Sequence, residues 1–226
     1  MTPRRRRRSS SPWTGYYRWT AGRPPREHLL RTLDHIDWEG GRPPRGTAIE
    51  LGFGAGTDTL ELLRRGWRVL AVDGERAAAA FLDRRVPAEH RRRLTIVVGP
   101  METIALPPAD LIYASFSLPF CPPDGFRRVW AAIRASLKPG GHFAGQLFGD
   151  RDEWRPRQPT MTFHSLSEVR RLARGFSLEL LRETTEAGMS YHGPKQWHYF
   201  DVILEKPRSA KRRSGRRGRA RASPSS

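Results

Sequence analysis

The stretch Ala48-Ile49-Glu50-Leu51-Gly52-Phe53-Gly54-Ala55-Gly56-Thr57 decides the fold class of this chain. An apolar run ends at Leu51, three glycines follow at every second position, and an amphipathic stretch begins at once. This order predicts a buried strand, a tight loop and the first turn of a helix. Glycines let the loop approach a ligand closely, and the helix behind it directs free N–H groups at the same point. The stretch therefore predicts a site for a nucleotide-bearing cofactor.

Two kinds of cofactor loop share this design. A dinucleotide-binding loop has the pattern Gly-x-Gly-x-x-Gly or Gly-x-Gly-x-x-Ala. In this chain Thr57 stands where that pattern would be completed, and the glycines instead form Gly-x-Gly-x-Gly behind the acidic Glu50. The loop alone therefore favours a different cofactor.

Two later stretches strengthen that choice. The apolar run 69–72 ends at Asp73-Gly74, about 20 positions beyond Gly52, where an α/β nucleotide fold places the acid that holds a ribose diol. Farther on, Lys138-Pro139-Gly140-Gly141 follows a helical stretch and precedes an apolar run. This Lys-Pro-Gly-Gly turn has no counterpart in the dinucleotide-binding pattern.

The glycine loop, Asp73 and the Lys-Pro-Gly-Gly turn, in this order, resemble the class I S-adenosylmethionine (SAM)-dependent methyltransferases. The resemblance covers roughly residues 14 to 205 and extends to small bacterial methyltransferases of the tellurite-resistance type. It implies an α/β fold: a Rossmann-like, doubly wound, seven-stranded sheet with an antiparallel last strand, in a three-layer α/β/α arrangement. It also implies SAM as the cofactor.

Periodicity and turn signals give the element order that this fold requires. Helices are predicted at 27–36, 56–65, 75–85, 123–137 and 165–174, the last of which starts with the capping pattern Ser165-Leu166-Ser167-Glu168. Strands are predicted near 47–51, 68–72, 94–98, 111–115, 142–147, 177–184 and 197–205. A loop over 186–196 is expected between the last two strands.

The chain has 226 residues and a formal net charge of +18, with the excess concentrated near both ends. Residues 1–12 and 207–226 are rich in Arg, Ser, Pro and Gly, so they are predicted to be disordered basic tails around one domain over 13–206. Such tails could contact nucleic acid weakly and in a salt-dependent way, or could simply be solvated.

The cysteine count, the lengths of the apolar runs and the histidine spacing bear on the cellular compartment and on metal binding. The single cysteine, Cys121, excludes an intramolecular disulfide, no apolar run is long enough to span a membrane, and no histidine spacing suggests a metal site. We expect a cytoplasmic protein without a membrane anchor and without a metal. Cys121 is expected to be buried packing, because its context differs from the Pro-Cys pattern of cytosine-C5 methyltransferases.

Parallel strands bring their carboxyl ends to one sheet edge, where ligands bind. Asp73 is predicted to accept hydrogen bonds from the ribose hydroxyls, or to cap the following helix. Glu102 is expected to replace the usual adenine-reading acid, and Met101 either packs on the adenine or fills the core. Arg23 either pairs with the cofactor carboxylate or is simply exposed. The predicted cofactor residues are Glu50, Gly52, Gly54, Gly56, Thr57, Asp73, Gly74, Met101, Glu102, Ser115, Phe116 and Arg23.

The sequence says less about the site for the methyl acceptor than about the cofactor site. Tyr17, Phe148, Trp154 and Trp197 are candidate lining residues, each of which could also be ordinary core. At the start of the last strand, His198 could act as a base and Lys195 could hold an anionic acceptor, or both could pack the final hairpin.

The expected function is SAM-dependent methyl transfer to a small-molecule acceptor through an O, S, N or metalloid nucleophile. Because the methyl group of a sulfonium is already activated, proximity and orientation would supply most of the catalysis. Two alternatives stay open: methylation of RNA, and a SAM-binding regulatory module that uses its basic tails.

Overall fold

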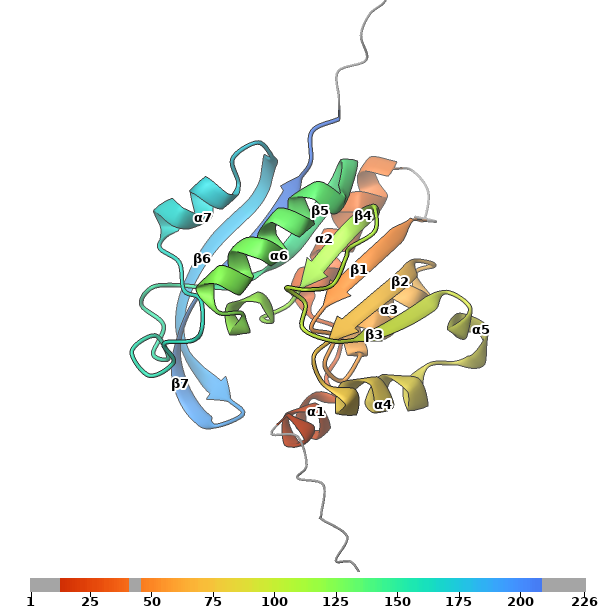
Figure 1. Cartoon of the computed structure of the whole chain (residues 1–226), viewed down its shortest axis with the longest axis horizontal. Coiled ribbons are helices and arrows are strands. Elements are labelled where there is room, and N and C mark those ends of the chain that lie inside the picture. Colours follow the sequence, from red (N-terminus) through yellow and green to blue (C-terminus); the bar gives the residue numbers. More distant parts are fainter. Residues whose placement is uncertain (1–12, 41–45, 209–226) are drawn as a thin grey trace, which may run out of the picture.

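The computed structural model describes residues 13–40 and 46–208, and they form one seven-stranded sheet with helices on both faces (Figure 1). The strand order is β3-β2-β1-β4-β5-β7-β6. Strand β7 is antiparallel to both of its neighbours, whereas β1 to β5 pair in parallel. The predicted fold class is confirmed. The strands are β1 (Thr47–Leu51), β2 (Arg68–Asp73), β3 (Leu94–Val98), β4 (Ala109–Ala114), β5 (Leu137–Phe148), β6 (Ser177–Ser190) and β7 (Gly193–Glu205).

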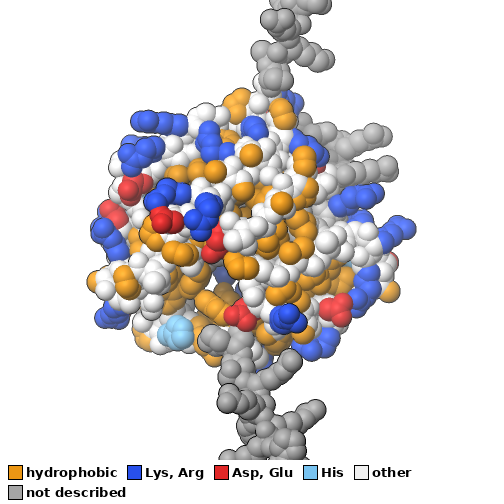
Figure 2. Space-filling view, in the orientation of Figure 1, with side chains coloured by type: hydrophobic (Ala, Val, Ile, Leu, Met, Phe, Trp, Pro, Cys, Tyr) orange, Lys and Arg blue, Asp and Glu red, His pale blue; other side chains and the backbone are white. Residues whose placement is uncertain are grey.

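The helices divide between the two faces of the sheet. One face carries α6 and α7, which lie toward the viewer in Figures 1 and 2, and the opposite face carries α1 to α4. The helices are α1 (Thr14–Thr20), α2 (Glu27–Gly40), α3 (Thr57–Arg64), α4 (Arg76–Arg85), α5 (Ala88–Arg91), α6 (Pro123–Ser136) and α7 (Leu166–Leu172), with a 3-10 turn η1 (Leu118–Phe120) before α6.

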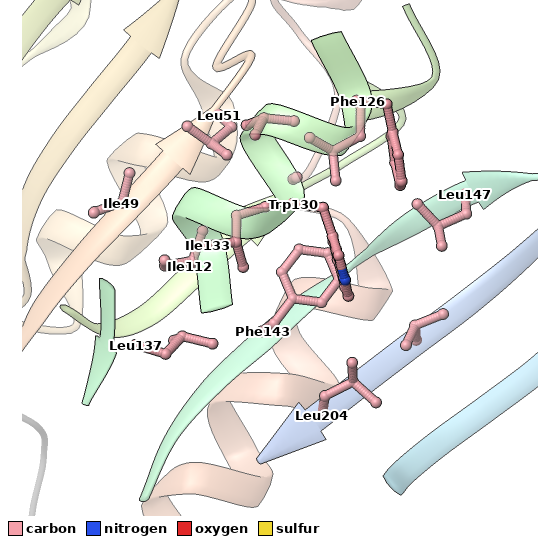
Figure 3. Packing of buried hydrophobic residues seen from close by; sticks show 14 of the residues in the cluster. Ile49, Leu51, Ile112, Phe126, Trp130, Ile133, Leu137, Phe143, Leu147 and Leu204 are labelled. Carbon is pink, nitrogen blue, oxygen red and sulfur yellow. The ribbon is translucent and has the colours of Figure 1, made fainter. Parts of the chain in front are cut away.

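Two apolar cores hold the layers together. The α6 side packs Trp130 edge-to-face on Phe143 of β5, with ring centroids 4.9 Å apart (Figure 3). Ile133 of α6 and Ile49 of β1 belong to the same cluster. Because β1 and β4 are covered on both sides, they are buried along almost their whole length, without alternation of buried and exposed residues. This buried centre fixes the loops at the strand ends.

In the second half of the chain the structure differs from the predicted helices, strands and turns. Lys138-Pro139-Gly140-Gly141 lies within β5, where Gly140 has a φ of +79° and its N–H donates to Lys206, so the predicted turn is an irregular strand start. The predicted loop 186–196 is mostly strand, and β6 and β7 turn only between Ser190 and Gly193. The predicted capping box at Ser165 and Glu168 is confirmed.

The hairpin is longer than expected because cross-strand pairing continues far past the edge of the parallel sheet. Helix α1 and the short elements α5 and η1 were not predicted. The predicted tail 1–12, and the predicted tail 207–226 except for Pro207 and Arg208, lie outside the described residues. Within the described part of the chain, no helix has the length and apolar character needed to cross a membrane.

Candidate functional site

The candidate site lies at the sheet edge where β1, β2, β4 and β5 end. Because β7 runs the other way, its first half reaches the same edge, and Phe148 at the end of β5 pairs with Tyr199. In Figure 1 this edge is the lower one, beside α1. The topology therefore brings the glycine loop and the hairpin to one side of the molecule, as predicted.

The glycine loop needs all three of its glycines. Gly52, Gly54 and Gly56 have φ values of 77°, 56° and 81°, in the left-handed region that only glycine adopts without strain. A Cβ on Gly52 would lie 2.3 Å from Cβ of Ser117, and a Cβ on Gly56 would lie 2.6 Å from Leu82. The loop thus passes tightly between β4 and α4 before α3 begins at Thr57.

The Asp73 carboxylate stands beside this loop at the end of β2. Oδ2 accepts from the Gly54 N–H at 2.9 Å, and Oδ1 accepts from the Glu75 N–H at 3.0 Å and the Tyr17 hydroxyl at 3.3 Å. Burial raises the pKa of Asp73, and these three hydrogen bonds oppose the rise. The N-cap residue of α4 is Glu75, so Asp73 supports the loop instead of capping the helix.

A second charged group lies on the other side of the loop. Asp58, in the first turn of α3, accepts from both Arg23 terminal nitrogens at 3.2 and 2.8 Å, and Arg26 Nε lies 4.0 Å from its Oδ2. Glu50 is buried nearby and accepts from the Thr59 hydroxyl. Burial, and then the charge of Asp58, raise the Glu50 pKa well above its usual value. The predicted Arg23 is therefore paired within the protein.

The region after β3 brings Met101 and Glu102 toward different neighbours. Met101 Cε lies 3.7 Å from the position that a Gly52 Cβ would take, so this side chain borders the glycine loop. Glu102 faces Cys121, whose Sγ lies 3.9 Å from Oε2. Cys121 is buried as predicted, and burial, followed by the Glu102 charge, raises its pKa to about 12.

Four rings form a continuous cluster, which we call the aromatic wall: the buried Phe148 and the half-buried Phe116, Trp197 and Tyr199. Phe116 lies 5.9 Å from Phe148, 6.0 Å from Trp197 and 5.2 Å from Tyr199 between centroids. It has a φ of 51°, which is unusual for a non-glycine residue, and the Arg26 guanidinium lies 5.0 Å from its ring. Phe116 thus connects the cofactor side with the wall.

Lys195 lies behind this wall in an enclosed cage. Its Nζ is 3.6 Å from the Trp197 ring centroid, 3.8 Å from Trp154 and 4.5 Å from Phe148. It also lies 2.8 Å from Oδ1 of Asp152, and the two side chains are only 1% and 0% exposed. Burial lowers the Lys195 pKa, and the Asp152 contact opposes this. The lysine charge is therefore neutralised inside the protein.

His198 is completely buried and both of its ring nitrogens are engaged. Nδ1 accepts from the Arg151 N–H at 2.9 Å, so Nε2 carries the proton that faces Glu183 Oε1, also at 2.9 Å. A Cβ on Gly149 would lie 2.0 Å from Nδ1. The ring therefore holds the start of β7 against the loop after β5.

Helix α1 and the hairpin tip meet across the edge. Tyr17, a predicted acceptor residue, is buried and contacts the cofactor loop through Asp73. The Tyr191 ring at the hairpin tip lies 6.1 Å from Tyr16 and 6.0 Å from Trp19, and a Cβ on Gly15 would overlap its hydroxyl. Helix α1 and the tip of the β6–β7 hairpin thus contact each other across this edge of the sheet.

Sequence reasoning missed Arg26, Asp58 and Asp152. In the sequence Arg26 precedes the glycine loop and Asp58 follows it, as opposite charges, but only the fold shows that their side chains lie close together. Asp152 follows β5 in a stretch that the sequence describes only as a loop. Across the described residues, no group of three or more His, Cys, Asp or Glu side chains is placed to hold a metal ion.

Comparisons with known proteins agree with this geometry. Residues 48–141 match the family model described as a methyltransferase domain, and no curated protein matches the chain by sequence. The chain has the fold of TehB from Haemophilus influenzae, a solved structure with 14% identity and a TM-score of 0.64. That match covers 78% of this chain and 62% of the TehB chain, so this chain spans less than two thirds of TehB.

Two further solved structures were determined with S-adenosylhomocysteine (SAH). The glycopeptide N-methyltransferase MtfA has 20% identity over 82% of this chain and 92% of its own, with a TM-score of 0.55. The 1,6-didemethyltoxoflavin-N1-methyltransferase from Burkholderia thailandensis has 20% identity over 80% of this chain and 79% of its own, with a TM-score of 0.54. At such low identity these likenesses show the fold. Residues 48–141 thus match a methyltransferase domain, and the chain as a whole has the fold of the class I methyltransferases.

Proposed function

We propose that this protein transfers the methyl group of SAM to a small molecule with a flat apolar group that packs on the aromatic wall. The observation that carries the proposal is the position of Phe116. Its ring contacts the other rings of the wall, and it also lies against the guanidinium of Arg26, which belongs to the proposed cofactor site. A molecule lying on this wall would stand next to the cofactor loop.

The residues around the loop fit the cofactor. Gly54 would place a Cβ no closer than 3.7 Å to Tyr17, and a Cβ on Gly74 would meet nothing within 4 Å, so a ligand can approach the backbone. Asp73 would hold the ribose hydroxyls. Met101 borders the loop, where its thioether would pack on the adenine.

The charged groups suit the amino-acid end of SAM. Glu50 and Asp58 offer carboxyl oxygens to its ammonium group, whose positive charge would oppose the rise of the Glu50 pKa. Arg26 Nε is buried and has no hydrogen-bond partner among the described residues, so it offers an unused donor to the SAM carboxylate. Arg23 would divide its donors between that carboxylate and Asp58.

SAM supplies a methyl group that is already activated on a sulfonium. The protein has to hold the acceptor in line, exclude water and leave the acceptor nucleophile free. The aromatic wall would hold the acceptor in line and exclude water. We infer that His198 and Lys195 act as positioning residues, because the His198 ring is engaged at both nitrogens and the Lys195 charge is compensated by Asp152. The acceptor would then be a nucleophile that needs no base from the protein, such as a thiolate or a ring nitrogen.

Calorimetry with SAM and SAH tests the cofactor, with a nicotinamide dinucleotide as the negative control. Transfer of a tritiated methyl group from SAM should then be measured to thiols, phenols, nitrogen heterocycles, metalloid oxyanions and bulk RNA. The proposal expects labelling of one of the aromatic acceptors, reduced by Trp197→Ala. Labelling of RNA alone, or SAM binding without any transfer, would support the two alternatives instead.

A further inference from the structure

A groove of about 510 Å³ opens on the face that carries α6 and α7, away from the cofactor loop. Its walls are the N-terminal end of α6, helix α7 and the segment 155–164 that follows β5. In the orientation of Figures 1 and 2 this face is turned toward the viewer, and basic side chains stand there beside apolar surface. None of the cofactor or wall residues lines the groove.

The floor of the groove carries several apolar side chains. Phe126 and Met161 are buried in it, and Phe163 and Leu172 border it. The His164 ring lies 4.6 Å from the Phe126 ring and is only 7% exposed. Its Nδ1 has no hydrogen-bond partner among the residues that the structure describes. A buried polar nitrogen without a partner is costly, so its presence in a groove wall suggests a ligand site.

The rim of the groove is cationic. Arg127, Arg155 and Arg171 line it, against the single acid Glu168. That acid is already used, because it accepts from the Ser165 N–H at 2.8 Å in the capping box of α7 and lies 3.8 Å from Arg171. Arg155 donates to the Asp150 carbonyl and makes no ion pair within the described ranges, so most of the N–H donors of its guanidinium group are unused.

The geometry points to a second ligand site in this groove, which binds a small molecule that combines a flat apolar group with a phosphate or carboxylate. The apolar part would lie on Phe126 and Met161, and the anionic part would be held by Arg155 and Arg171. Arginine suits this role because its planar fork matches carboxylate and phosphate oxygens. The site is distinct from the methyl-transfer site and does not depend on the proposed acceptor.

Binding can be measured by NMR titration of the full chain saturated with SAH, which keeps the cofactor site filled. Four probes separate the two parts of the ligand: phenyl phosphate, benzoate, benzyl alcohol and inorganic phosphate. Phenyl phosphate and benzoate are expected to bind more tightly than benzyl alcohol or inorganic phosphate, because only they engage both floor and rim.

Arg155→Gln and Arg171→Gln are each expected to weaken phenyl phosphate binding by about 3- to 10-fold, since each removes one partly solvated charge-assisted contact. Arg170→Gln is the matched control, because Arg170 lies on α7, is exposed and does not line the groove. SAH affinity should be the same in all three variants. Absence of phenyl phosphate binding, or equal weakening by all three variants, would overturn the proposal.

Discussion

The Tyr17 hydroxyl lies 3.3 Å from Oδ1 of Asp73, so the first helix of the domain is attached to the end of β2 through the carboxylate that we assign to the ribose. Both Asp73 oxygens already accept from the protein, at Gly54 and Glu75 as well as Tyr17. A bound ribose would share this carboxylate with the two backbone donors. The contact with Tyr17 therefore links cofactor binding to the position of α1.

Asp73→Asn should weaken SAH binding by about 1.5–3 kcal/mol, which corresponds to about 10- to 150-fold, because hydrogen bonds to a charged acceptor have this strength. Asparagine keeps one oxygen for the loop N–H groups, so the fold should survive. Calorimetric titration with SAH measures the effect, and Asp83→Asn, an exposed acid of α4 paired with Arg91, is the control. Equal SAH affinity in a folded Asp73→Asn variant would retire the ribose assignment.

Tyr17→Phe removes the hydroxyl and keeps the ring that packs beside Gly54. We expect SAH affinity to change by less than about 3-fold, because the Tyr17 hydroxyl contacts the Asp73 carboxylate and not the cofactor, and the Gly54 and Glu75 N–H groups still hold that carboxylate. A loss as large as that of Asp73→Asn would instead mean that Tyr17 orients the carboxylate. The two variants should be titrated under the same conditions.

Lys195→Met leaves the Asp152 carboxylate enclosed without its cation, so the free energy of unfolding should fall by about 3–5 kcal/mol. Asp152→Asn in the same chain should restore part of this loss, because asparagine removes the unpaired charge and its single amide oxygen still accepts from one of the two N–H groups, those of Trp154 and His198, that bind separate oxygens of the carboxylate. Urea unfolding of the two single variants and the double variant gives the coupling energy.

Lys138→Met is the control for this cycle. Its ammonium pairs with Asp110 at 2.8 Å, but both side chains are partly exposed. Such a pair contributes at most about 1 kcal/mol. If Lys195→Met cost no more than this control while abolishing methyl transfer, Lys195 would be a reacting group and not a positioning residue.

His164 should make the protein less stable in acid. Burial lowers its pKa from 6.5 to about 4, so the unfolded chain binds more protons between these pH values. The His164 contribution is therefore intact above pH 6.5 and is lost as the pH falls to about 4, with a total of about 3 kcal/mol. Urea unfolding from pH 7 to pH 4 should show a shallower decline for His164→Gln than for the unchanged protein. Parallel curves would show that His164 does not titrate differently on folding.

The first half of the sheet and the cofactor loop could be predicted from the sequence because their signals are local. A run such as Ala48 to Leu51 must be buried, and Gly52 to Gly56 must turn, whatever surrounds them. The bounds of β1 and β3 were predicted without error for the same reason.

The acceptor side could not be predicted because its contacts join distant parts of the chain. The cage around Lys195 takes Phe148 from the end of β5, Asp152 and Trp154 from the following loop, and Trp197 from β7. Gly188 and Pro194 lie in the stretch 186–196 that was expected to be a loop, yet each lies in a strand of a long hairpin whose register is set by its cross-strand neighbours.

The strand order has a consequence for how such a protein can diversify. Every residue assigned to SAM lies between Arg23 and Phe116, on the β3-β2-β1-β4 half of the sheet, whereas most of the aromatic wall comes from β5 and β7. The methyltransferase domain model matches only 48–141, which is the first of these halves and the start of β5. If the proposed assignments hold, substitutions along the hairpin would change which acceptor binds and would leave the residues proposed for SAM unchanged.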